Sequence, residues 1–253
     1  MEPENWFYAG CGLLVIGLAC LWGYLYYAKR LRLILQTPTI ACRDLPGLGA
    51  SIVEVKGAIE ADVPLTSDLC SIPCVAFTST ITEHWTTTRT VSDSKGGSRT
   101  VTDHHTAVRY QNDARIDFNI RDTSGLATVE IDGADLELID QSAGPASSQS
   151  PAFGICATHW NGHLTYAESL LPIGCTGYIL AQVTERHTLG KPINVDSHFL
   201  ISSRSEESIV SSTRWGKGIC GTAFTASLAG GGAAFGYWYQ ITGGVWPWQS
   251  ATN

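Results

Sequence analysis

Two long apolar stretches flank a middle region in which apolar and polar residues alternate. The first stretch, Trp6–Tyr27, contains no charged residue. As a helix it would reach ~33 Å at ~1.5 Å per residue, which is enough to cross the hydrocarbon core of a bilayer. Its length, and the absence of Lys or Arg before it, argue against a cleaved signal peptide. The pattern therefore predicts a retained transmembrane helix.

The middle region is predicted to be mainly β. Ile52–Ile59 alternates and is rich in β-branched residues, while the Thr-rich Val75–Arg89 returns as Arg99–Val108 after a turn at Asp93–Ser98. Further strands are expected at Arg115–Ile120, Ala127–Ile131, Leu136–Ile139, Gly177–Glu185 and Phe199–Ser202. Tyr166–Leu171 fits a strand or a short helical turn, and Glu206–Val210 fits a short helix. We expect a soluble domain resembling a β-barrel or a β-sandwich, inserted between two transmembrane α-helices.

The second apolar stretch, Ile219–Trp246, is rich in glycine and alanine. Small residues allow helices in a bilayer to approach closely, and Gly232 and Gly236 have the spacing of a packing motif. We expect these two glycines to pack against Trp6–Tyr27 or against a helix of another subunit. The alternative is a glycine-rich terminal segment that is buried in the β domain.

The chain is predicted to have six segments. They are a short outer N-terminus (1–5), a transmembrane helix (6–27), its basic membrane-proximal end (28–36), the β-rich domain (37–212), a second transmembrane helix (219–246) and a short Trp-containing C-terminus (247–253).

Aromatic and basic residues near the two stretches predict how the chain lies in a membrane. Aromatic rings favour the bilayer interfaces, and Lys and Arg favour the cytoplasmic side. The residues expected at the interfaces are Trp6, Trp22, Lys29, Arg30, Arg32, Arg214, Lys217 and Trp246. The chain is therefore predicted to be a two-pass protein with both termini outside and the main domain in the cytoplasm.

The charge balance indicates the kind of partner. The whole chain carries a formal net charge of −7, and residues 33–213 hold 11 basic and 21 acidic residues, a net charge of −10. An acidic domain is unsuited to nucleic acid, which requires a basic face. Membrane lipids and membrane or membrane-associated proteins, including those of a multisubunit complex, are the expected partners. Of the eight cysteines, three lie in the apolar stretches and an odd five are scattered through the domain, which favours a reducing compartment.

No pattern of residues predicts a catalytic, cofactor or metal site. His104 and His105 are adjacent on a predicted strand and should point to opposite faces. His159 and His163 enclose a turn signal, so helical spacing does not apply to them. Cys70 and Cys74 have no second cysteine pair to complete a zinc site.

Several segments, taken in order, resemble the BAM ("beside a membrane") domain of the GIDE family, the membrane-anchored E3 ubiquitin ligases of mitochondria and plastids and their bacterial relatives. The segments are Ile52–Gly57, Pro64–Ser67, Ile72–Phe77, Phe118–Gly125, Leu171–Gly174 and Phe199–Glu207. The resemblance covers roughly residues 37–212. It implies a β-rich domain held against a membrane by two helices and engaged with other proteins.

The sequence departs from the family's ligases in one respect. Those proteins end in a RING finger, whose zinc ions need about eight Cys or His ligands in pairs, and this sequence has no such pairs. The chain is therefore expected to be a RING-less, bacterial-type relative and not an enzyme. The leading hypothesis is a membrane-anchored scaffold whose acidic β domain binds partner proteins. The alternatives are an integral accessory subunit of a respiratory or photosynthetic complex, and an unrecognised membrane-bound enzyme that uses His104, His105 or His159.

Overall fold

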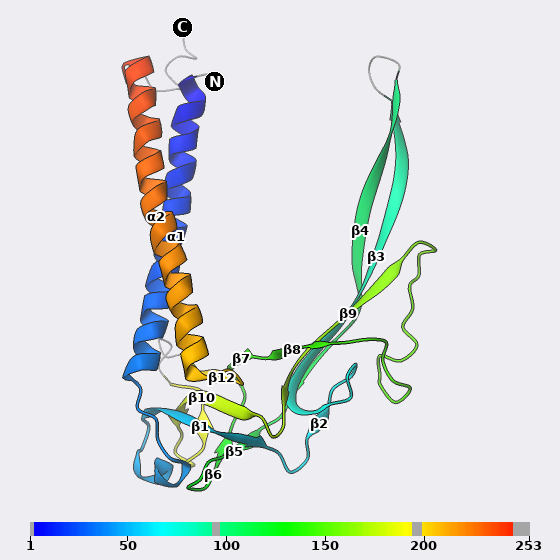
Figure 1. The fold of residues 1–253 in the computed structure, drawn as a ribbon, viewed down its shortest axis with the longest axis vertical. Coiled ribbons are helices and arrows are strands. Elements are labelled where there is room, and N and C mark those ends of the chain that lie inside the picture. The colour runs from blue at the N-terminus through cyan, green and yellow to red at the C-terminus, as the bar shows by residue number, and fades with distance from the viewer. Residues whose placement is uncertain (1–2, 93–96, 194–198, 245–253) are drawn as a thin grey trace. The chain divides into compact units, whose positions relative to one another are not determined.

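The computed structural model describes residues 3–92, 97–193 and 199–244. The chain divides into two compact units (Figure 1). One combines the two ends of the chain, residues 1–37 and 206–253, and the other is the continuous segment Pro38–Ser205.

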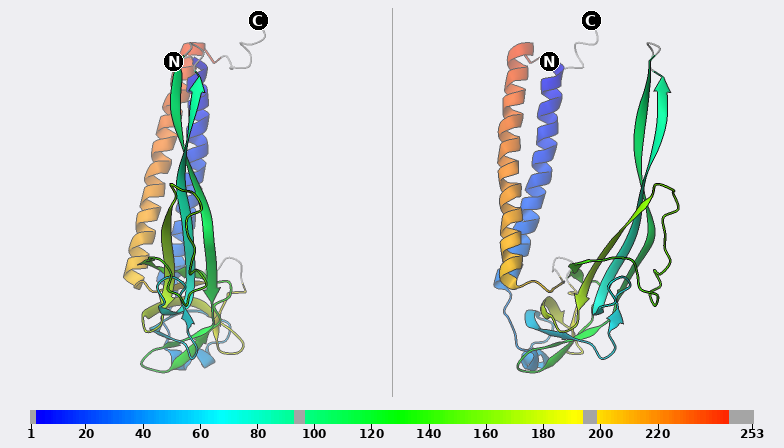
Figure 2. Two further views of the ribbon diagram at one scale, coloured as in Figure 1. Left: turned by 90° about the vertical axis from the view of Figure 1, so that its right-hand side faces the viewer. Right: turned by 45° about the vertical axis from the view of Figure 1, so that its right-hand side comes forward.

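The first unit is a pair of long helices, α1 (Pro3–Gln36) and α2 (Glu206–Thr242), which lie side by side in every view (Figure 2). Small residues sit where the helices meet. A Cβ on Gly10 would lie 2.9 Å from the Phe235 ring, and one on Gly23 would lie 3.0 Å from Cys220 Sγ. Since low numbers in α1 meet high numbers in α2, the helices are antiparallel.

Only one helix in the described part of the chain is long and apolar enough to span a membrane. This helix, Asn5–Gln36, contains the predicted anchor Trp6–Tyr27 and could span a membrane. The expected second span, 219–246, is not supported. It lies largely within α2, whose glycine, serine and threonine residues lower its mean hydropathy. The two-pass topology, with both termini outside, has no support either.

The second unit contains a closed barrel of five strands. The strands are β1 (Ile52–Glu60), β5 (Phe118–Arg121), β6 (Leu126–Val129), β11 (Leu189–Gly190) and β10 (Thr176–Val183). They pair in this order, and β10 returns to pair antiparallel with β1 over seven residue pairs. Two further strands, β12 (Leu200–Ser202) and β7 (Asp135–Glu137), extend the sheet from β10.

Alternating side chains of these strands fill the barrel. Val53, Val55, Ile120 and Ile179 are almost fully buried, and they pack with Leu45 from a short 3-10 helix, η1 (Cys42–Gly47). Closure of the barrel demands a glycine at position 57, because a Cβ there would run into the backbone carbonyl of Arg121. The prediction of a β-rich, barrel-like domain is therefore confirmed.

A second sheet is organised around one long strand, β3 (Pro73–Ser92). It pairs with β9 (His163–Pro172) and forms a hairpin with β4 (Ser98–Arg115), while β2 (Leu65–Thr66) and β8 (Ile139–Ser142) are short additions. Since β9 pairs only as far as His84, the outer part of the hairpin runs on as two strands (Figure 1).

The strand predictions differ from the structure mainly at boundaries. The strand expected at Arg115–Ile120 is broken, since β4 ends at Arg115 and β5 begins at Phe118. The region Leu136–Ile139 is shared between β7 and β8, and Tyr166–Leu171 lies within a strand. The short helix expected at Glu206–Val210 is the beginning of α2, so the second unit ends at Ser205 rather than at 212.

Candidate protein-binding site

One face of the second sheet gathers most of its buried polar groups. Alternate residues of β3 point to the same face, which places Ser79, Ile81, Glu83 and Trp85 together. A β-bulge opposite Ile81 and Thr82 leaves Arg109 of β4 without a cross-strand partner, since Ile81 faces Tyr110 and Thr82 faces Val108. The extra residue turns the Arg109 side chain toward Glu83.

The Glu83 carboxylate fastens a loop to this face. The backbone N–H groups of Thr158 and His159 donate to Glu83 Oε1 at 2.9 and 2.8 Å. Arg109 Nε donates to Oε2 at 2.6 Å, and Thr158 Oγ1 donates to the same oxygen at 3.0 Å. The Glu83 side chain is fully buried. A buried carboxylate with this many donors holds Thr158 and His159 in one position.

The electrostatics of Glu83 agree with this arrangement. Burial alone would raise the pKa of Glu83, but the hydrogen bonds from the His159 backbone, Arg109 and Thr158 outweigh it and lower the pKa to about 2. The carboxylate is therefore ionised at neutral pH and acts as an acceptor only. His159 Nδ1 lies 3.2 Å from Glu83 Oε1, and the Thr158 hydroxyl donates to the carboxylate, so both side chains take part in the attachment.

The chain turns directly after this attachment. The N–H of Gly162 donates to the carbonyl of His159 at 2.9 Å and closes a turn with Trp160 and Asn161 at its centre. Asn161 Nδ2 donates to the carbonyl and the hydroxyl of Thr86, at 2.8 and 3.0 Å. A side chain at Gly162 would run into Glu83 Oε1, so only glycine fits there. We call the segment Thr158–Gly162 the docked turn.

Trp160 is held in place yet almost entirely exposed. Its side chain is 96% accessible, although its two neighbours are fixed to β3. On one side of it, the His159 ring stacks on Trp85 with ring centres 4.0 Å apart and planes within 4°. Trp85 also stacks with His105 at 5.4 Å. An exposed indole on a fixed stretch of backbone is typical of the anchor residues of protein interfaces.

A second buried carboxylate fixes the neighbouring loop. Glu168 Oε1 accepts hydrogen bonds from Leu69 N–H and Ser79 Oγ at 2.8 and 2.6 Å, and Oε2 accepts from Cys70 N–H and Ser67 Oγ at 2.7 and 2.9 Å. Burial would raise the pKa of Glu168, but these hydrogen bonds outweigh it and lower the pKa. Between the two carboxylates, Ile81, Leu69 and Ala152 form a small apolar cluster.

The structure separates the histidines that the sequence singled out. His104 is exposed, whereas His105 lies on the other face beside Trp85, as the alternation of a strand predicts. His159 belongs to the docked turn, and His163 instead stacks on His84 at 5.1 Å. Cys74 is buried, and burial raises the pKa of its thiol to about 11. Within residues 3–92, 97–193 and 199–244, no group of three or more His, Cys, Asp or Glu side chains could hold a metal ion.

The expected membrane-interface residues lie on both helices. Trp6 contacts Tyr237 edge-on at 5.0 Å, Trp22 is 74% exposed, and Lys217 Nζ lies 5.2 Å from the centre of the Tyr24 ring. Trp246 falls outside the described residues. These contacts place aromatic and basic residues along the helix pair, and they do not test the predicted depth in a bilayer.

The glycines expected to pack do not contact α1. A Cβ on Gly232 or Gly236 would meet no atom within 4 Å, whereas one on Gly231 would lie 3.6 Å from the Gly10 carbonyl. Within this chain, α1 therefore packs on a neighbouring face of α2. Packing of Gly232 and Gly236 against another chain stays a prediction.

The sequence singles out His159 of the docked turn but not Trp160. Asn161-Gly162 was recognised as a turn signal, but a tryptophan directly before it was given no weight. That juxtaposition is the signal that points to an exposed aromatic side chain. Glu83 and Arg109 carry no such signal, because their meeting depends on the bulge.

The fold and the docked turn define a β-rich domain that displays an exposed indole and continues at its ends into two long helices. The chain belongs to the GIDE family, described as E3 ubiquitin ligase, whose match covers residues 86–235 and thus more than half of the chain. No curated protein and no solved structure matches it. The matched region includes Arg109 and the whole docked turn, and it ends within α2.

This family description corrects the expectation that the chain is not an enzyme, because ubiquitin ligases are enzymes. The expectation was based on missing motifs. Catalysis by proximity consists of holding two reactants together, so it need not leave a constellation of acid, base and nucleophile in the sequence. Missing motifs were therefore a poor guide here.

Proposed function

We propose that this chain takes part in ubiquitin ligation at a membrane, with the β unit binding the protein that is to be modified. The observation that carries the proposal is Trp160, which is 96% exposed in a turn that is fixed on both sides. Exposure of a tryptophan side chain has no benefit for folding. It is explained if a partner protein covers the indole.

The anchoring of the turn makes it suited to binding. A flexible loop loses conformational freedom when it binds, at about 0.5–1.5 kcal/mol for each immobilised side chain. Here Glu83, Asn161 and the stack of His159 on Trp85 have already ordered the segment. The partner that fits best offers an apolar pocket for the indole, and a basic rim would suit the net charge of −10 over residues 33–213.

The helix α1 supplies the membrane attachment in this proposal. It is long and apolar enough to span a bilayer, and it ends at Gln36, directly before the β unit begins at Pro38. A target bound by Trp160 would then be held by a membrane-attached protein, which raises its local concentration.

A photo-crosslinking residue at position 160 tests the proposal directly. The full-length chain would be expressed with benzoylphenylalanine in place of Trp160, irradiated in its native membrane, and the crosslinked protein identified. We expect that protein to carry ubiquitin, and Trp160→Ala to weaken its binding by about 30-fold or more, as for an interface anchor worth at least ~2 kcal/mol. Val63→Ala is the matched control, because Val63 is 81% exposed but lies on another loop.

Two results would contradict the proposal. One is an unchanged ubiquitin level on the crosslinked protein in the Trp160→Ala variant. The other is a fixed, stoichiometric partner that carries no ubiquitin, which would favour an accessory subunit of a larger complex instead.

Narrower assignments remain predictions. They are membership of the BAM group, a bacterial-type origin without a RING finger, and a cytoplasmic β unit with both termini outside. Cys156 is exposed whereas Cys74 is buried, so Cys156 is the thiol to label. Labelling of Cys156 by an impermeant maleimide from the outside would contradict the topology.

A further inference from the structure

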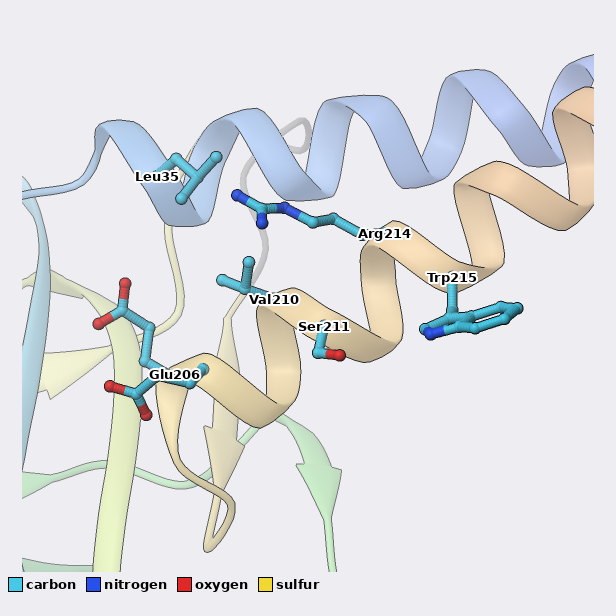
Figure 3. Close-up of a pocket in the computed structure, with 7 residues that line it drawn as sticks. Leu35, Glu206, Val210, Ser211, Arg214 and Trp215 are labelled. Atoms are coloured by element: carbon cyan, nitrogen blue, oxygen red, sulfur yellow. The ribbon is translucent and has the colours of Figure 1, made fainter.

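A charged pocket opens between the two helices of the first unit, near the start of α2. Its volume is about 410 Å³. Figure 3 shows Glu206 at one end, the Arg214 side chain extending toward α1 and Leu35, and Trp215 pointing away from α1. Glu207, Val210 and Ser211 complete the lining. Carboxylates and a guanidinium thus face the same space.

A second groove continues from this pocket along the helix pair. It has a volume of about 580 Å³, and Arg214 lines both spaces. The remaining lining residues are Tyr24, Leu31, Lys217, Gly218, Gly221, Thr222 and Thr225. A Cβ on Gly218 would meet no atom within 4 Å, and one on Gly221 would lie 3.4 Å from the Tyr24 ring, so the groove is kept open by small residues.

The lining residues of α2 follow one face of the helix. Glu207, Ser211, Arg214, Gly218, Gly221 and Thr225 are spaced by three or four residues, which is the period of a helical stripe. Along this stripe, Glu207 comes first, Arg214 follows after Ser211, and the small uncharged residues Gly218, Gly221 and Thr225 come last, while Glu206 and Lys217 lie next to Glu207 and Arg214 in the lining. At ~1.5 Å per residue, Glu207 to Thr225 spans ~27 Å.

The contacts between α1 and α2 show which residues of the stripe lie beside the apolar part of α1 and which lie beside its basic end. A Cβ on Gly216 would contact the Tyr27 ring, and one on Gly221 the Tyr24 ring, so Arg214 and Lys217 lie at the end of the apolar part of α1. The basic residues Lys29, Arg30 and Arg32 follow directly in α1. The small-residue groove therefore lies beside the apolar part of α1, and the acidic residues lie beyond the basic ones.

We propose that this groove binds one phospholipid with a primary ammonium headgroup, of the phosphatidylethanolamine class. An acyl chain lies in the groove from Gly218 to Thr225, the phosphate meets Arg214 and Lys217, and the ammonium meets Glu206 and Glu207. The order of groups in the lipid matches the order of residues along the stripe. An anionic lipid would place its headgroup beside the two glutamates, and a choline lipid cannot donate hydrogen bonds to them.

The proposal requires that α1 spans a bilayer and that the adjoining part of α2 from Gly218 to Thr225 lies in the bilayer beside it, but it is independent of what Trp160 binds. Its test is native mass spectrometry of the full-length chain released from nanodiscs that contain equal amounts of ethanolamine, choline and glycerol phospholipids with the same acyl chains. We expect one ethanolamine lipid to be retained, about tenfold more often than either of the others, since charge-assisted hydrogen bonds contribute ~1.5–3 kcal/mol.

Three variants examine the parts of the site separately, and a fourth, Arg32→Gln, is the control. Arg214→Gln should lose the retained lipid, whereas Arg32→Gln, a nearby exposed basic residue outside the lining, should keep it. The double variant Glu206→Gln with Glu207→Gln should still retain a lipid but no longer prefer ethanolamine. Gly218→Leu fills the groove and should abolish retention of every lipid. Helix content by circular dichroism shows whether each variant is folded.

Two outcomes would overturn the proposal. One is equal retention in Arg214→Gln and Arg32→Gln. The other is equal retention of the three lipid classes by the unmodified chain. Loss of the Trp160 crosslink would leave both readouts unchanged, so the two proposals fail independently.

Discussion

Glu168 is expected to be the most sensitive polar residue of the β unit. Each of its two carboxylate oxygens accepts one backbone N–H and one hydroxyl hydrogen bond. In Glu168→Gln, the amide nitrogen replaces one of these oxygens without a change of volume. A serine hydroxyl can rotate and accept from the new amide, but the N–H of Leu69 or Cys70 cannot.

The cost follows from this count. One buried N–H without an acceptor costs about 1–3 kcal/mol, and the two remaining hydrogen bonds each lose ~1 kcal/mol when their acceptor loses its charge. We therefore expect Glu168→Gln to lower the free energy of unfolding by about 3–5 kcal/mol. This is a large share of the ~5–15 kcal/mol that is usual for a domain.

The assay is urea unfolding of the full-length protein in detergent at pH 7, followed by tryptophan fluorescence. Glu185→Gln removes an exposed carboxylate and should change the free energy of unfolding by less than ~0.5 kcal/mol. The lowered pKa of Glu168 adds a second signature. Its stabilisation is complete above the ordinary carboxyl pKa of 4.5 and is lost as the pH falls, so the difference between parent and variant should shrink in acid. A loss below ~1 kcal/mol at pH 7 would refute the reasoning.

Three further predictions concern the docked turn and the helices. Gly162→Ala should release the turn, because its Cβ would run into Glu83 Oε1, and hydrogen exchange of the His159 amide should then accelerate. The control Gly97→Ala places its Cβ in open space and should leave that exchange unchanged. Because the pKa of Glu83 is lowered to about 2, the His159 amide should stay protected from exchange down to about pH 4.5 and lose its protection as the pH falls toward about 2. Loss of this protection well above pH 4.5 would contradict the prediction. In Gly23→Leu the new side chain would meet Cys220, so cysteine crosslinking between α1 and α2 should fail. Gly232→Leu should leave this crosslinking intact. A reduced particle mass in detergent for Gly232→Leu would show that this glycine packs against another chain.

Much of the fold could be predicted from local patterns, and the errors arose where distant segments decide the outcome. Ile52–Ile59 alternates, so its strand was identified almost to the residue. The helix α1 was equally clear from its uninterrupted apolar run. Closure of the barrel between β1 and β10 joins residues more than a hundred positions apart, and no local pattern indicates it.

The candidate site was hidden for the same reason. Glu83 is an ordinary polar position in a Thr-rich strand. Its hydrogen-bond partners come from the bulge at Arg109 and from the loop that leads into β9. The residues of α2 that meet α1 could not be selected from the sequence either, because glycines occur on several faces of that helix. Spacing alone identified Gly232 and Gly236, whereas Gly231 is the one that lies near Gly10.

The docked turn divides the β3–β4 hairpin into two parts with different duties. Up to His84, β3 is paired with β4 on one side and β9 on the other, and from Trp85 onward it pairs with β4 alone. A two-stranded ribbon has little stability of its own, and its exposed edges invite pairing with other chains. Threonine and charged side chains protect those edges here. The outer hairpin is consequently a removable module: a shortened protein that joins Thr88 to its partner Thr102 through a two-residue turn would keep Glu83, Arg109 and Trp160 and become a smaller, less aggregation-prone target for crystallisation.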